Sequence, residues 1–580
     1  MSDRLANVTS LPDRAVPTRL GNWVFETKAA LLRLRRAGAD LALDAPKRHR
    51  RGATLTEAPV LATIRSPLWT TRGGAKDRAL NAGKIQNLRA AIAGLDGIEI
   101  APGELLSFWR QVGKPLRRRG FVEGRELREG CMIATVGGGL CQLSNALHEA
   151  ALDAGLEVVE RHAHTRVVPG SRAEAGRDAT VFWNYLDFRI RSARPFRIEA
   201  KLTADELELT ISGEMAAVPL AAADFLAGTI AHDCLTCGQT SCHRHNPDEI
   251  EAGTPTAWLV DGASPEFAGL LRERVGPEDV LILPSRRIGR AVAGWPAIGA
   301  ERTADLAALH RSLALRTAGN TPRARLLLDA DARLAAAYAR RLDATHTHLV
   351  IAQPLLPHLW RLGVLQGRSF EVLLDRLPID AMHRVLDAAR DLYPDSTTLG
   401  DFRAPEAIAA AEREALGEAV RLITPHRAVA ARFPPKRVEL LDWLPGKPLA
   451  ARHGGRTFLF AGPALARKGA YAMREAMLEL DITLLIERPG EERPGFWGDL
   501  DVRPMQSQPE ELAGVILPAI VEHRPATLLR ALATGLPVIA TEACGLPPQP
   551  GLTLIPPCDP EALRKAIAAA LIQSSAGSLS

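Results

Sequence analysis

The sequence of 580 residues lacks the features that would mark a membrane-spanning or secreted protein. No apolar run approaches the ~20 residues that cross a bilayer. The first residues, MSDRLANVTS, do not show the basic and then apolar order of a signal peptide. The chain also contains no low-complexity tract and no repeat of short period. We therefore expect a cytoplasmic protein.

Cysteine is scarce as well. There are seven cysteines, an odd number, and three of them fall within nine positions, which is unlike the even spacing of a secreted disulfide framework. This pattern again predicts a reducing compartment. With 46% hydrophobic and 24% charged residues the composition is that of an ordinary globular protein, and the length predicts two or three domains.

The positive charge is concentrated at the N-terminus. Residues 1–51 hold eleven Lys and Arg against five Asp and Glu, a net charge of +6. The whole chain carries +5, so the remaining 529 residues carry about −1. The stretch WVFETKAALLRLRRAG mixes Trp23 and leucines with arginines, and KRHRR follows. One interpretation is an amphipathic basic segment that contacts the inner face of an anionic membrane. The other is a solvated helix and a flexible arm. We expect no nucleic acid partner.

Two patterns divide the rest of the chain. Residues 57–215 mix helical and strand periodicity. Helices are predicted over DRALNAGKIQNLRAAIAGL and from about Cys141 to Ala154, where Gly155 ends the helix. Strands are predicted over LEVVERHAH, VFWNYLDFRIRS, RPFRIEAKL and ELELTISG, the last three being successive and antiparallel.

From about residue 256 to 575, short apolar strands alternate with helical stretches rich in Ala and Leu. The predicted strands are AWLVDG, DVLILP, RLLLDA, HLVIAQ, FEVLLD, RLITP, TFLFAG, ITLLIE, GVILP and PVIAT. The alternation predicts two Rossmann-like, doubly wound halves joined near LLDWLPGKP, and hence a multidomain α/β and α+β protein. The predicted domains are a basic arm (1–56), an α+β domain with an antiparallel sheet (57–220), a Cys/His-rich segment (221–255) and the two halves (256–450 and 451–580).

A cysteine at a predicted helix start is the first candidate for chemistry. Cys141 follows the glycines 137–139, which allow a tight turn, and a helix N-terminus favours the thiolate. His162 and His164 are two residues apart, hence on one face of the predicted strand, and Asp178 precedes the next strand. This chain order resembles that of papain-like and transglutaminase-like thiol enzymes. It predicts a Cys-His-Asp triad, and the alternative is an inert, packed cysteine.

Three blocks of this region resemble the VanW family, which is named from an accessory protein of vancomycin-resistance clusters. They are NAGKIQNLRAAIAGLDGIEIAPGELLSFWRQVG, GGGLCQLSNALHEAALDAGLEVVERHAHTR and GRDATVFWNYLDFRI, and together they cover roughly residues 80–215. The resemblance implies an association with the bacterial cell envelope. Many relatives resemble secreted or membrane-anchored proteins, and we expect this chain to differ because it shows no such leader.

The segment HDCLTCGQTSCHRHNP predicts a metal site. Cys234, Cys237, Cys242 and His245 follow the spacing C-x2-C-x4-C-x2-H, which suits tetrahedral zinc. Three thiolates with a fourth ligand would also suit an iron–sulfur cluster. The remaining interpretation is three unligated cysteines in a polar loop. A closed set of four ligands predicts a structural metal rather than a catalytic one.

The segments RTFLFAGPALARKGAYAMREAM and VILPAIVEHRPATLLRALATGLPVIATEACGLP resemble the nucleotide-sugar half of retaining GT-B glycosyltransferases. The resemblance implies that Gly462, Arg467 and Lys468 bind the donor pyrophosphate. Glu522 occupies the first position of a pair of glutamates typical of that family, and Arg530 replaces the second, which contacts the donor ribose. Residues 256–450 resemble the acceptor half.

The sequence therefore predicts an envelope-biogenesis protein that transfers a sugar from a nucleotide-sugar-like donor to an envelope glycan or its lipid-linked precursor. Cys141, His164 and Asp178 would form a second site, that of a thiol-dependent hydrolase or transferase. The alternative hypothesis is a non-catalytic scaffold that binds glycan or nucleotide through a degenerate GT-B fold. Arg530 favours that alternative, as does the lack of a secretory route to mature peptidoglycan.

Overall fold

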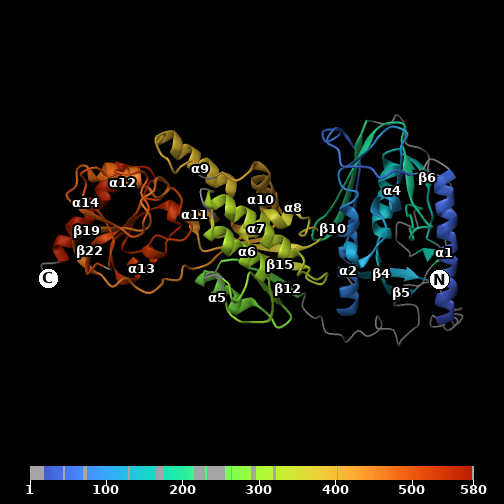
Figure 1. The fold of residues 1–580 in the computed structure, drawn as a ribbon, viewed down its shortest axis with the longest axis horizontal. Helices are drawn as coiled ribbons and strands as arrows, with labels where there is room; N and C mark the ends of the chain where they lie inside the picture. The colour runs from blue at the N-terminus through green and yellow to red at the C-terminus, as the bar shows by residue number, and fades with distance from the viewer. Residues whose placement is uncertain are drawn as a thin grey trace, which may run out of the picture. The chain divides into compact units, whose positions relative to one another are not determined.

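The computed structural model divides into two compact units (Figure 1). Unit 1 comprises residues 1–255 with the short stretches 343–347 and 365–369, and unit 2 comprises the rest. The residues described are 19–42, 46–69, 75–128, 131–164, 166–167, 176–214, 229–230, 255–262, 264–288, 295–317, 322–400, 403–507 and 509–577.

The predicted metal ligands Cys234, Cys237, Cys242 and His245 lie outside these residues. Within the described ranges no group of three or more His, Cys, Asp or Glu side chains is arranged to hold a metal ion. Zinc and an iron–sulfur cluster therefore stay predictions. None of the described helices is both long and apolar enough to cross a bilayer.

Unit 1 consists of a long N-terminal helix, small antiparallel sheets and helices that pack on them. In chain order its elements are α1 (Arg19–Ala42), β1 (Val60–Pro67), α2 (Ala75–Ile92), β2 (Ile98–Ile100), β3 (Leu105–Ser107), α3 (Phe108–Val112), η1 (Arg117–Arg119), β4 (Glu123–Arg128), β5 (Cys131–Val136), α4 (Cys141–Asp153), β6 (Glu157–Glu160), β7 (Arg166–Val167), β8 (Arg189–Arg191), β9 (Phe196–Leu202), β10 (Glu206–Gly213) and β11 (Thr229–Ile230).

The main sheet of unit 1 has the order β1-β10-β9-β2, and all its pairings are antiparallel. A second sheet has the order β3-β8-β6, and β4 pairs with β5 as a hairpin. Alternate residues of β9 and β10 are buried, which gives the sheet one apolar face. Leu143 and Leu147 of α4 are fully buried and pack into this core together with Leu88 of α2.

The predicted helices of unit 1 are confirmed, and so are the antiparallel strands β9 and β10. Gly155 follows α4 with φ of +68°, a value that favours glycine at a helix end. Two predicted strands are wrong in extent. LEVVERHAH is a strand only over Glu157–Glu160, and VFWNYLDFRIRS only over Arg189–Arg191, because residues 182–186 form a turn closed by a bridge between Phe182 and Leu186.

Unit 2 contains two parallel sheets with helices between their strands. The elements of its first half are β12 (Thr256–Leu259), α5 (Pro265–Arg274), β13 (Val280–Leu283), β14 (Ala300–Thr303), α6 (Asp305–Arg316), α7 (Arg323–Ala339), β15 (His348–Ala352), η4 (Gln353–Leu355), α8 (Leu356–Arg361), β16 (Ser369–Leu373), α9 (Ile379–Leu392), α10 (Glu406–Glu418), β17 (Arg421–Thr424), α11 (Arg427–Ala430), η5 (Pro435–Arg437) and β18 (Val438–Leu440).

The elements of its second half are β19 (Arg452–Phe460), η6 (Ala466–Lys468), α12 (Ala470–Met477), β20 (Thr483–Ile486), β21 (Val502–Pro504), β22 (Glu511–Leu517), α13 (Ala526–Thr534), β23 (Val538–Thr541), η7 (Glu542–Cys544), β24 (Leu552–Ile555) and α14 (Pro560–Gly577). The strand orders of the two halves are β14-β13-β12-β15-β16-β17-β18 and β21-β20-β19-β22-β23-β24.

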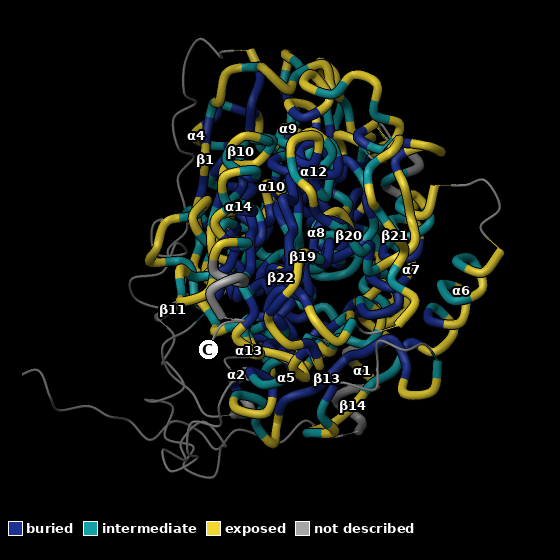
Figure 2. Tube along the Cα trace, turned by 90° about the vertical axis from the view of Figure 1, so that its left-hand side faces the viewer, coloured by how far each residue is buried: buried dark blue, intermediate teal, exposed yellow. Residues whose placement is uncertain are grey.

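The strands in the middle of each sheet are buried on both faces, as expected for parallel sheets covered by helices. Figure 2 shows this for β22, which is dark blue along most of its length, whereas α6 is largely yellow and teal. The predicted fold class, an antiparallel α+β part followed by two Rossmann-like halves, is confirmed. One predicted strand is wrong: RLLLDA lies in α7, because the apolar pattern continues with helical spacing through the buried Leu334 and Tyr338.

Candidate functional sites

The first candidate site lies at the N-terminus of α4 in unit 1. The thiol of Cys141, the first residue of α4, lies 3.6 Å from the hydroxyl of Thr180 and 3.9 Å from the carbonyl oxygen of Val181, and the nearby imidazole of His164 lowers its pKa. On its other side His164 contacts Asp178, with 2.6 Å between Nδ1 and Oδ2. The structure therefore brings Cys141, His164 and Asp178 together in a line. We call this group the thiol site.

Asp178 holds His164 in place with several contacts at once. Its Oδ2 also accepts the backbone N–H of His164 at 2.7 Å, and its Oδ1 accepts from Nη2 of Arg161 at 2.7 Å. The carboxylate is buried, and the imidazole is one-quarter exposed. A buried carboxylate with three donors fixes both the position of the ring and the nitrogen that faces the thiol.

The electrostatics of the three groups reinforce one another. Burial raises the pKa of the Cys141 thiol, but the hydrogen bond and the charge of His164 outweigh it, and the pKa ends below its usual value. Burial lowers the pKa of His164, but Asp178 and the thiol raise it to about 9. The pKa of Asp178 falls to about 2 because His164 and Arg161 outweigh its burial. The two shifts act in the same direction, toward a thiolate beside an imidazolium, which is the reactive form of a nucleophilic cysteine.

The glycines before Cys141 are required by close backbone contacts. A Cβ on Gly138 would lie 2.4 Å from the carbonyl oxygen of Gly124 in β4, and one on Gly139 would lie 2.1 Å from Cγ of Lys84 in α2. Gly139 also has φ of +93°. The tight turn predicted from the sequence is therefore present, and it delivers the chain directly into the first turn of α4.

Two residues near the thiol site were missed in the sequence. Arg161 donates from Nη2 to Oδ1 of Asp178, and its position directly before His162 in ERHAH was the available signal. Lys84 is buried next to α4, where its Nζ donates to the carbonyl of Leu68 at 2.6 Å and to Oε1 of Gln142 at 2.8 Å. Burial, with a smaller effect of Arg125, lowers the pKa of Lys84 to about 7.

His162 does not join the thiol site. Its Nε2 lies 2.9 Å from Oε1 of Glu160, and its side chain is more than one-third exposed. The expectation that His162 and His164 share one strand face is wrong, because β6 ends at Glu160 and both histidines follow it in a segment without regular structure. The two rings therefore make separate contacts, one with Glu160 and the other with Asp178.

The second candidate site lies in the second half of unit 2, at the carboxyl ends of parallel strands. In doubly wound sheets ligands bind at this edge. The residues lining this cavity are Ala461, Gly462, Pro463, Lys468, Glu487, Arg488, Leu517, Glu522, Arg524, Pro525, Ala526, Thr527 and Leu528. They follow β19, β20 and β22 and include the first turn of α13, which has no side-chain cap. We call it the phosphate pocket, because uncapped helix N–H groups and basic side chains together favour an anion.

Lys468 and Glu522 form an ion pair inside the phosphate pocket. Nζ of Lys468 lies 2.8 Å from Oε2 of Glu522, and both side chains are almost nine-tenths buried. Burial raises the pKa of Glu522, but Lys468 outweighs it and the pKa falls below its usual value. Oε1 of Glu522 accepts the backbone N–H groups of His523 and Arg524 at 2.8 and 3.1 Å. The lysine is therefore held in a fixed position.

The other predicted donor residues are placed differently. Gly462 lines the phosphate pocket, but the described residues that line it do not include Arg467 or Arg530. Arg530 donates from Nε to the carbonyl of Lys447 at 2.8 Å and lines a small neighbouring cavity. Glu487 lines both cavities, so it stands between them.

Glu487 is a residue that the sequence prediction missed, although it is the last residue of the predicted strand ITLLIE and directly follows β20, at the edge where ligands bind. Its Oε1 accepts from the hydroxyl of Thr527 at 2.6 Å. Its Oε2 is buried and has no hydrogen-bond partner in the described part of the chain. It lies 3.8 Å from Nε of Arg488, an exposed side chain. A buried carboxylate oxygen without a donor is costly unless a ligand supplies one.

A third cavity, of about 190 Å³, lies in unit 2 and contains further unpaired polar atoms. Among the described side chains that line it, Oε2 of Glu266 and Nε1 of Trp295 are buried without a hydrogen-bond partner. Oε1 of Glu266 accepts from the N–H of Leu444 at 3.1 Å and lies 3.3 Å from Nη2 of Arg524. Nε of Arg524, which also lines the cavity, is a second buried donor without a hydrogen-bond partner among the described residues. An unpaired acceptor with two unpaired donors suits hydroxyl groups, which both donate and accept.

Comparison with known proteins identifies the domain that carries the thiol site. The family described as "VanW like protein" matches residues 83–212, which confirms the predicted VanW resemblance for this part of the chain. YoaR of Bacillus subtilis strain 168, an uncharacterized protein, is 35% identical over 133 residues, which are 23% of this chain and 43% of YoaR. The vancomycin B-type resistance protein VanW of Enterococcus faecalis is 30% identical over 133 residues, 22% of this chain and 48% of that protein. The chain thus spans less than half the length of either relative.

Solved structures with some similarity are glycosyltransferases and related enzymes. Sucrose-phosphate synthase from Thermosynechococcus elongatus shares 16% identity, with 56% of this chain and 91% of that chain covered and a TM-score of 0.38. HepE of Anabaena, solved in complex with UDP and glucose, shares 11% identity, with 56% and 92% covered and a TM-score of 0.33. The assignment of two Rossmann-like halves to this chain depends on its own sheet topology.

Proposed function

We propose that the protein transfers a sugar from a nucleotide-sugar donor to a bacterial envelope glycan or to a lipid-linked precursor of one. The observation that carries the proposal is the phosphate pocket, in which Lys468 and the uncapped N-terminus of α13 supply a fixed charge and free amides. A pyrophosphate requires both. As the bond to the sugar breaks, negative charge grows on the departing nucleoside diphosphate, and Lys468 is positioned to stabilise it.

Glu487 resolves the difficulty raised by Arg530. In the family that this half resembles, a glutamate at that position contacts the donor ribose. An arginine cannot replace it, because its side chain cannot accept a hydrogen bond from a ribose hydroxyl. Glu487 stands between the two cavities, and its buried Oε2 has no hydrogen-bond partner among the described residues. Its carboxylate, at the end of β20, accepts the hydrogen bond of a ribose hydroxyl in place of the missing glutamate. Arg530 then lines the cavity on the nucleobase side of the donor.

The sugar acceptor fits the cavity lined by Glu266 and Trp295. Its unpaired carboxylate oxygen and indole N–H would pair with a sugar hydroxyl, and the aromatic ring gives an apolar face against which a sugar ring packs. The envelope as the place of action is supported by the match of residues 83–212 to the VanW family and by the printed name of the Enterococcus relative, a vancomycin resistance protein.

Titration of a panel of nucleotide sugars against the full chain tests the proposal. Lys468→Ala is expected to weaken the binding of the preferred donor about tenfold to a hundredfold, because a charged hydrogen bond to phosphate is lost. Lys565→Ala, an exposed lysine of α14 that pairs with Glu561, is the matched control and is expected to leave binding unchanged. Equal weakening by both variants, or no binding of any nucleotide sugar, would overturn the proposal. Binding without sugar transfer would favour the scaffold hypothesis.

A second candidate function, favoured by the geometry of the thiol site, is thiol-dependent acyl transfer or hydrolysis. The Cys141 thiolate would attack a carbonyl carbon, and the imidazolium of His164 would give its proton to the leaving amine or alcohol. Water or another nucleophile would then release the acyl group from the cysteine, with His164 as base. Asp178 would keep the ring oriented through both steps.

Mass-spectrometric mapping after brief treatment with iodoacetamide tests this candidate. Cys141 is expected to be alkylated first at neutral pH. Cys544 and Cys558 are internal controls, because burial raises the pKa of Cys544 to about 12 and that of Cys558 above its usual value. If Cys141 reacts no faster than these two thiols, the cysteine is an inert packing residue and the second candidate fails.

A further inference from the structure

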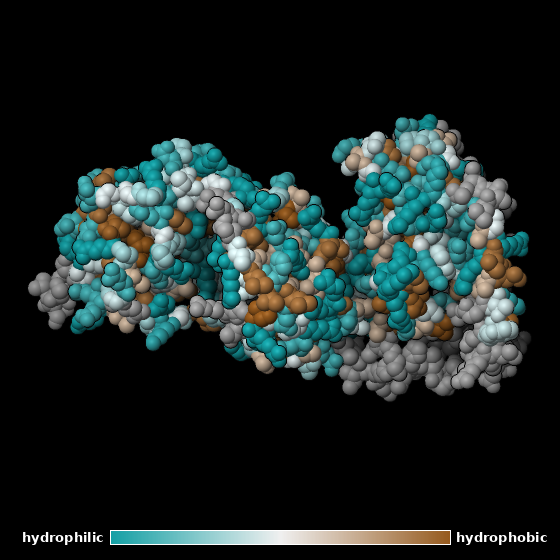
Figure 3. Space-filling view, in the orientation of Figure 1, coloured by the Kyte–Doolittle hydropathy of each residue, from teal (hydrophilic) through white to brown (hydrophobic). Residues whose placement is uncertain are grey.

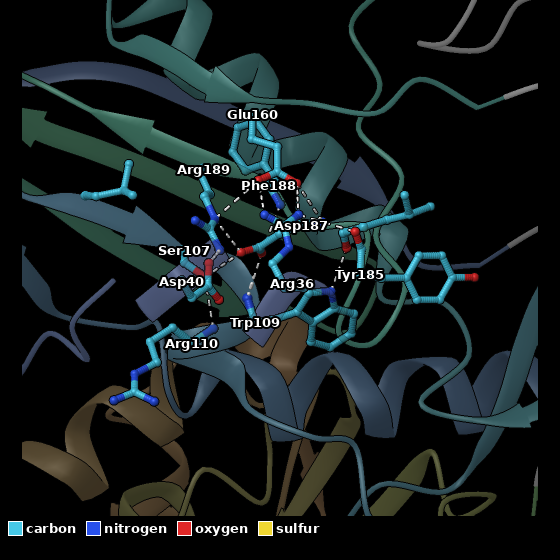
Figure 4. A network of polar contacts seen from close by, with 12 residues as sticks. Arg36, Asp40, Ser107, Trp109, Arg110, Glu160, Tyr185, Asp187, Phe188 and Arg189 are labelled. Carbon is cyan, nitrogen blue, oxygen red and sulfur yellow. Dashed lines mark hydrogen bonds and ion pairs between the residues drawn. The ribbon is translucent and has the colours of Figure 1, made fainter. Parts of the chain in front are cut away.

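Helix α1 is held against the rest of unit 1 by ion pairs. Arg36 is bound to Glu160 by two hydrogen bonds, one of them 2.7 Å between Nη1 and Oε2, and Asp40 accepts from Nη2 of Arg189 at 2.7 Å. Figure 4 shows these side chains converging, with Asp187 accepting from Arg189 at 2.9 Å behind them. The rotation of α1 about its own axis is therefore fixed by charged contacts.

The contacts come from one stripe of the helix. Ala29, Arg33, Arg36 and Asp40 are spaced by four, three and four residues, so they share one face. Ala29 is 2% exposed, and Nε of Arg33 donates to the carbonyl of Trp183 at 3.1 Å. The face that meets the protein is thus mostly charged.

The opposite face of α1 is apolar and basic. Trp23, Leu31 and Leu34 are 66%, 68% and 71% exposed, and in Figure 3 brown residues lie over α1 at the right-hand edge. Lys28 and Arg35 are also exposed on this side, at helical spacing from the leucines. An ordinary surface helix buries its apolar stripe and exposes its charges. In α1 the arrangement is inverted, because the apolar stripe is exposed and the charged stripe contacts the protein.

We infer that this outer face of α1, defined by Trp23, Lys28, Leu31, Leu34 and Arg35, binds an anionic phospholipid surface. The apolar side chains match the boundary between acyl chains and headgroups, and the long stems of the two basic residues let their charges reach lipid phosphates. The two charged side chains described on this face are both basic, and residues 1–51 as a whole carry +6. The ion pairs of the inner face remain intact when the outer face enters the headgroup region.

This inference does not depend on the proposed sugar transfer or on the thiol site. The test is sedimentation of the full chain with vesicles of phosphatidylcholine alone or mixed with phosphatidylglycerol. We expect binding to the mixed vesicles that weakens with added salt. The double variant Leu31→Gln/Leu34→Gln is expected to lower the partition constant about tenfold or more, because apolar area leaves the interface. Lys28→Gln/Arg35→Gln is expected to abolish the preference for the anionic lipid.

The matched control is Leu306→Gln/Leu313→Gln on α6, where the two leucines are 85% and 51% exposed. It removes the same number of exposed leucines from a helix of unit 2 and is expected to leave vesicle binding unchanged. Equal loss in both double variants would overturn the inference, and so would a wild type that ignores both vesicles. A wild-type dimer that dissociates in Leu31→Gln/Leu34→Gln, without vesicle binding, would assign the outer face to a second copy of the chain instead.

Discussion

The thiol site and the phosphate pocket differ in whether their charged groups are paired within the protein. In the thiol site each charged group has a partner of opposite charge. Asp178 contacts both His164 and Arg161, and His164 lowers the pKa of Cys141. In the phosphate pocket Lys468 and Glu522 form a close ion pair, whereas Oε2 of Glu487 has no hydrogen-bond partner among the described residues and lies 3.8 Å from Nε of the exposed Arg488.

This difference separates a site organised for reaction from a site organised for binding. A nucleophile needs its neighbours in place before the substrate arrives, since their order sets its pKa and direction. A binding pocket needs donors and acceptors that the ligand completes, and an unpaired buried oxygen is the cost of that arrangement in the free protein. Replacing a carboxylate by its amide should therefore mainly lower stability in the thiol site and mainly weaken ligand binding in the phosphate pocket.

The largest effect is expected from Asp178→Asn. The variant keeps the shape but replaces the acceptor of Arg161 and of the His164 ring by an uncharged amide, so a buried charge network loses its centre. We expect the free energy of unfolding of unit 1 to fall by about 3 kcal/mol. Hydrogen exchange of the full chain measures this: amides of α4 should lose protection, while those of β22 in unit 2 serve as the internal reference. Unchanged protection of α4 would show that the network contributes little.

A smaller effect, on reactivity, is expected from His164→Gln. In the wild type the imidazolium lowers the pKa of the Cys141 thiol against the effect of burial, so alkylation should reach half of its maximum below the usual thiol range. Without the imidazolium only burial and the weaker contacts with Thr180 and Val181 remain, and the midpoint moves upward. At pH 7 we expect alkylation about tenfold slower. The measurement is the pH profile of the alkylation rate of the Cys141 peptide, and a midpoint equal to that of the wild type would contradict the pairing.

Much of the scaffold of both sites follows from local pattern. The helix that begins at Cys141 has apolar residues at helical spacing and a glycine at each end, and these signals are strong enough to place it within one residue of its observed bounds. The parallel strands are short apolar runs with polar residues at their carboxyl ends. Gly462 and Lys468, which line the pocket, were predicted from the resemblance to GT-B glycosyltransferases. These features depend on residues close in sequence.

The failures come from contacts between residues far apart in sequence. VFWNYLDFRIRS alternates like a strand, yet Asp187 accepts from the Ser107 hydroxyl at 2.6 Å and from the N–H of Trp109 at 3.0 Å. These bonds fix Asp187 at the start of α3, and the chain before it forms a turn instead of continuing a strand. The contact that Arg530 makes could not be predicted for a related reason. Its place in the sequence matches a ribose contact, but its side chain reaches the carbonyl of Lys447, which no local pattern indicates.

The smallest effect on stability is expected from Glu487→Gln, the counterpart of Asp178→Asn in the phosphate pocket. The amide oxygen still accepts from the Thr527 hydroxyl, and the atom it replaces, Oε2, has no hydrogen-bond partner among the described residues. Removing a buried charge at that atom offsets the loss of its weak attraction to Arg488, so the free energy of unfolding of unit 2 should change by less than about 1 kcal/mol.

The same substitution should nevertheless weaken the binding of the preferred nucleotide sugar about tenfold, since a ribose hydroxyl loses a charged acceptor and meets an amide N–H₂ in its place. Calorimetric titration combined with hydrogen exchange of β22 measures both quantities on one sample. Unit 2 losing stability in step with binding would mean that Glu487 supports the fold, and the contrast between a paired reactive site and an unpaired binding site would then fail. Weaker binding of the nucleotide sugar with unchanged stability of unit 2 would mean that Oε2 of Glu487 accepts a hydrogen bond from the ligand.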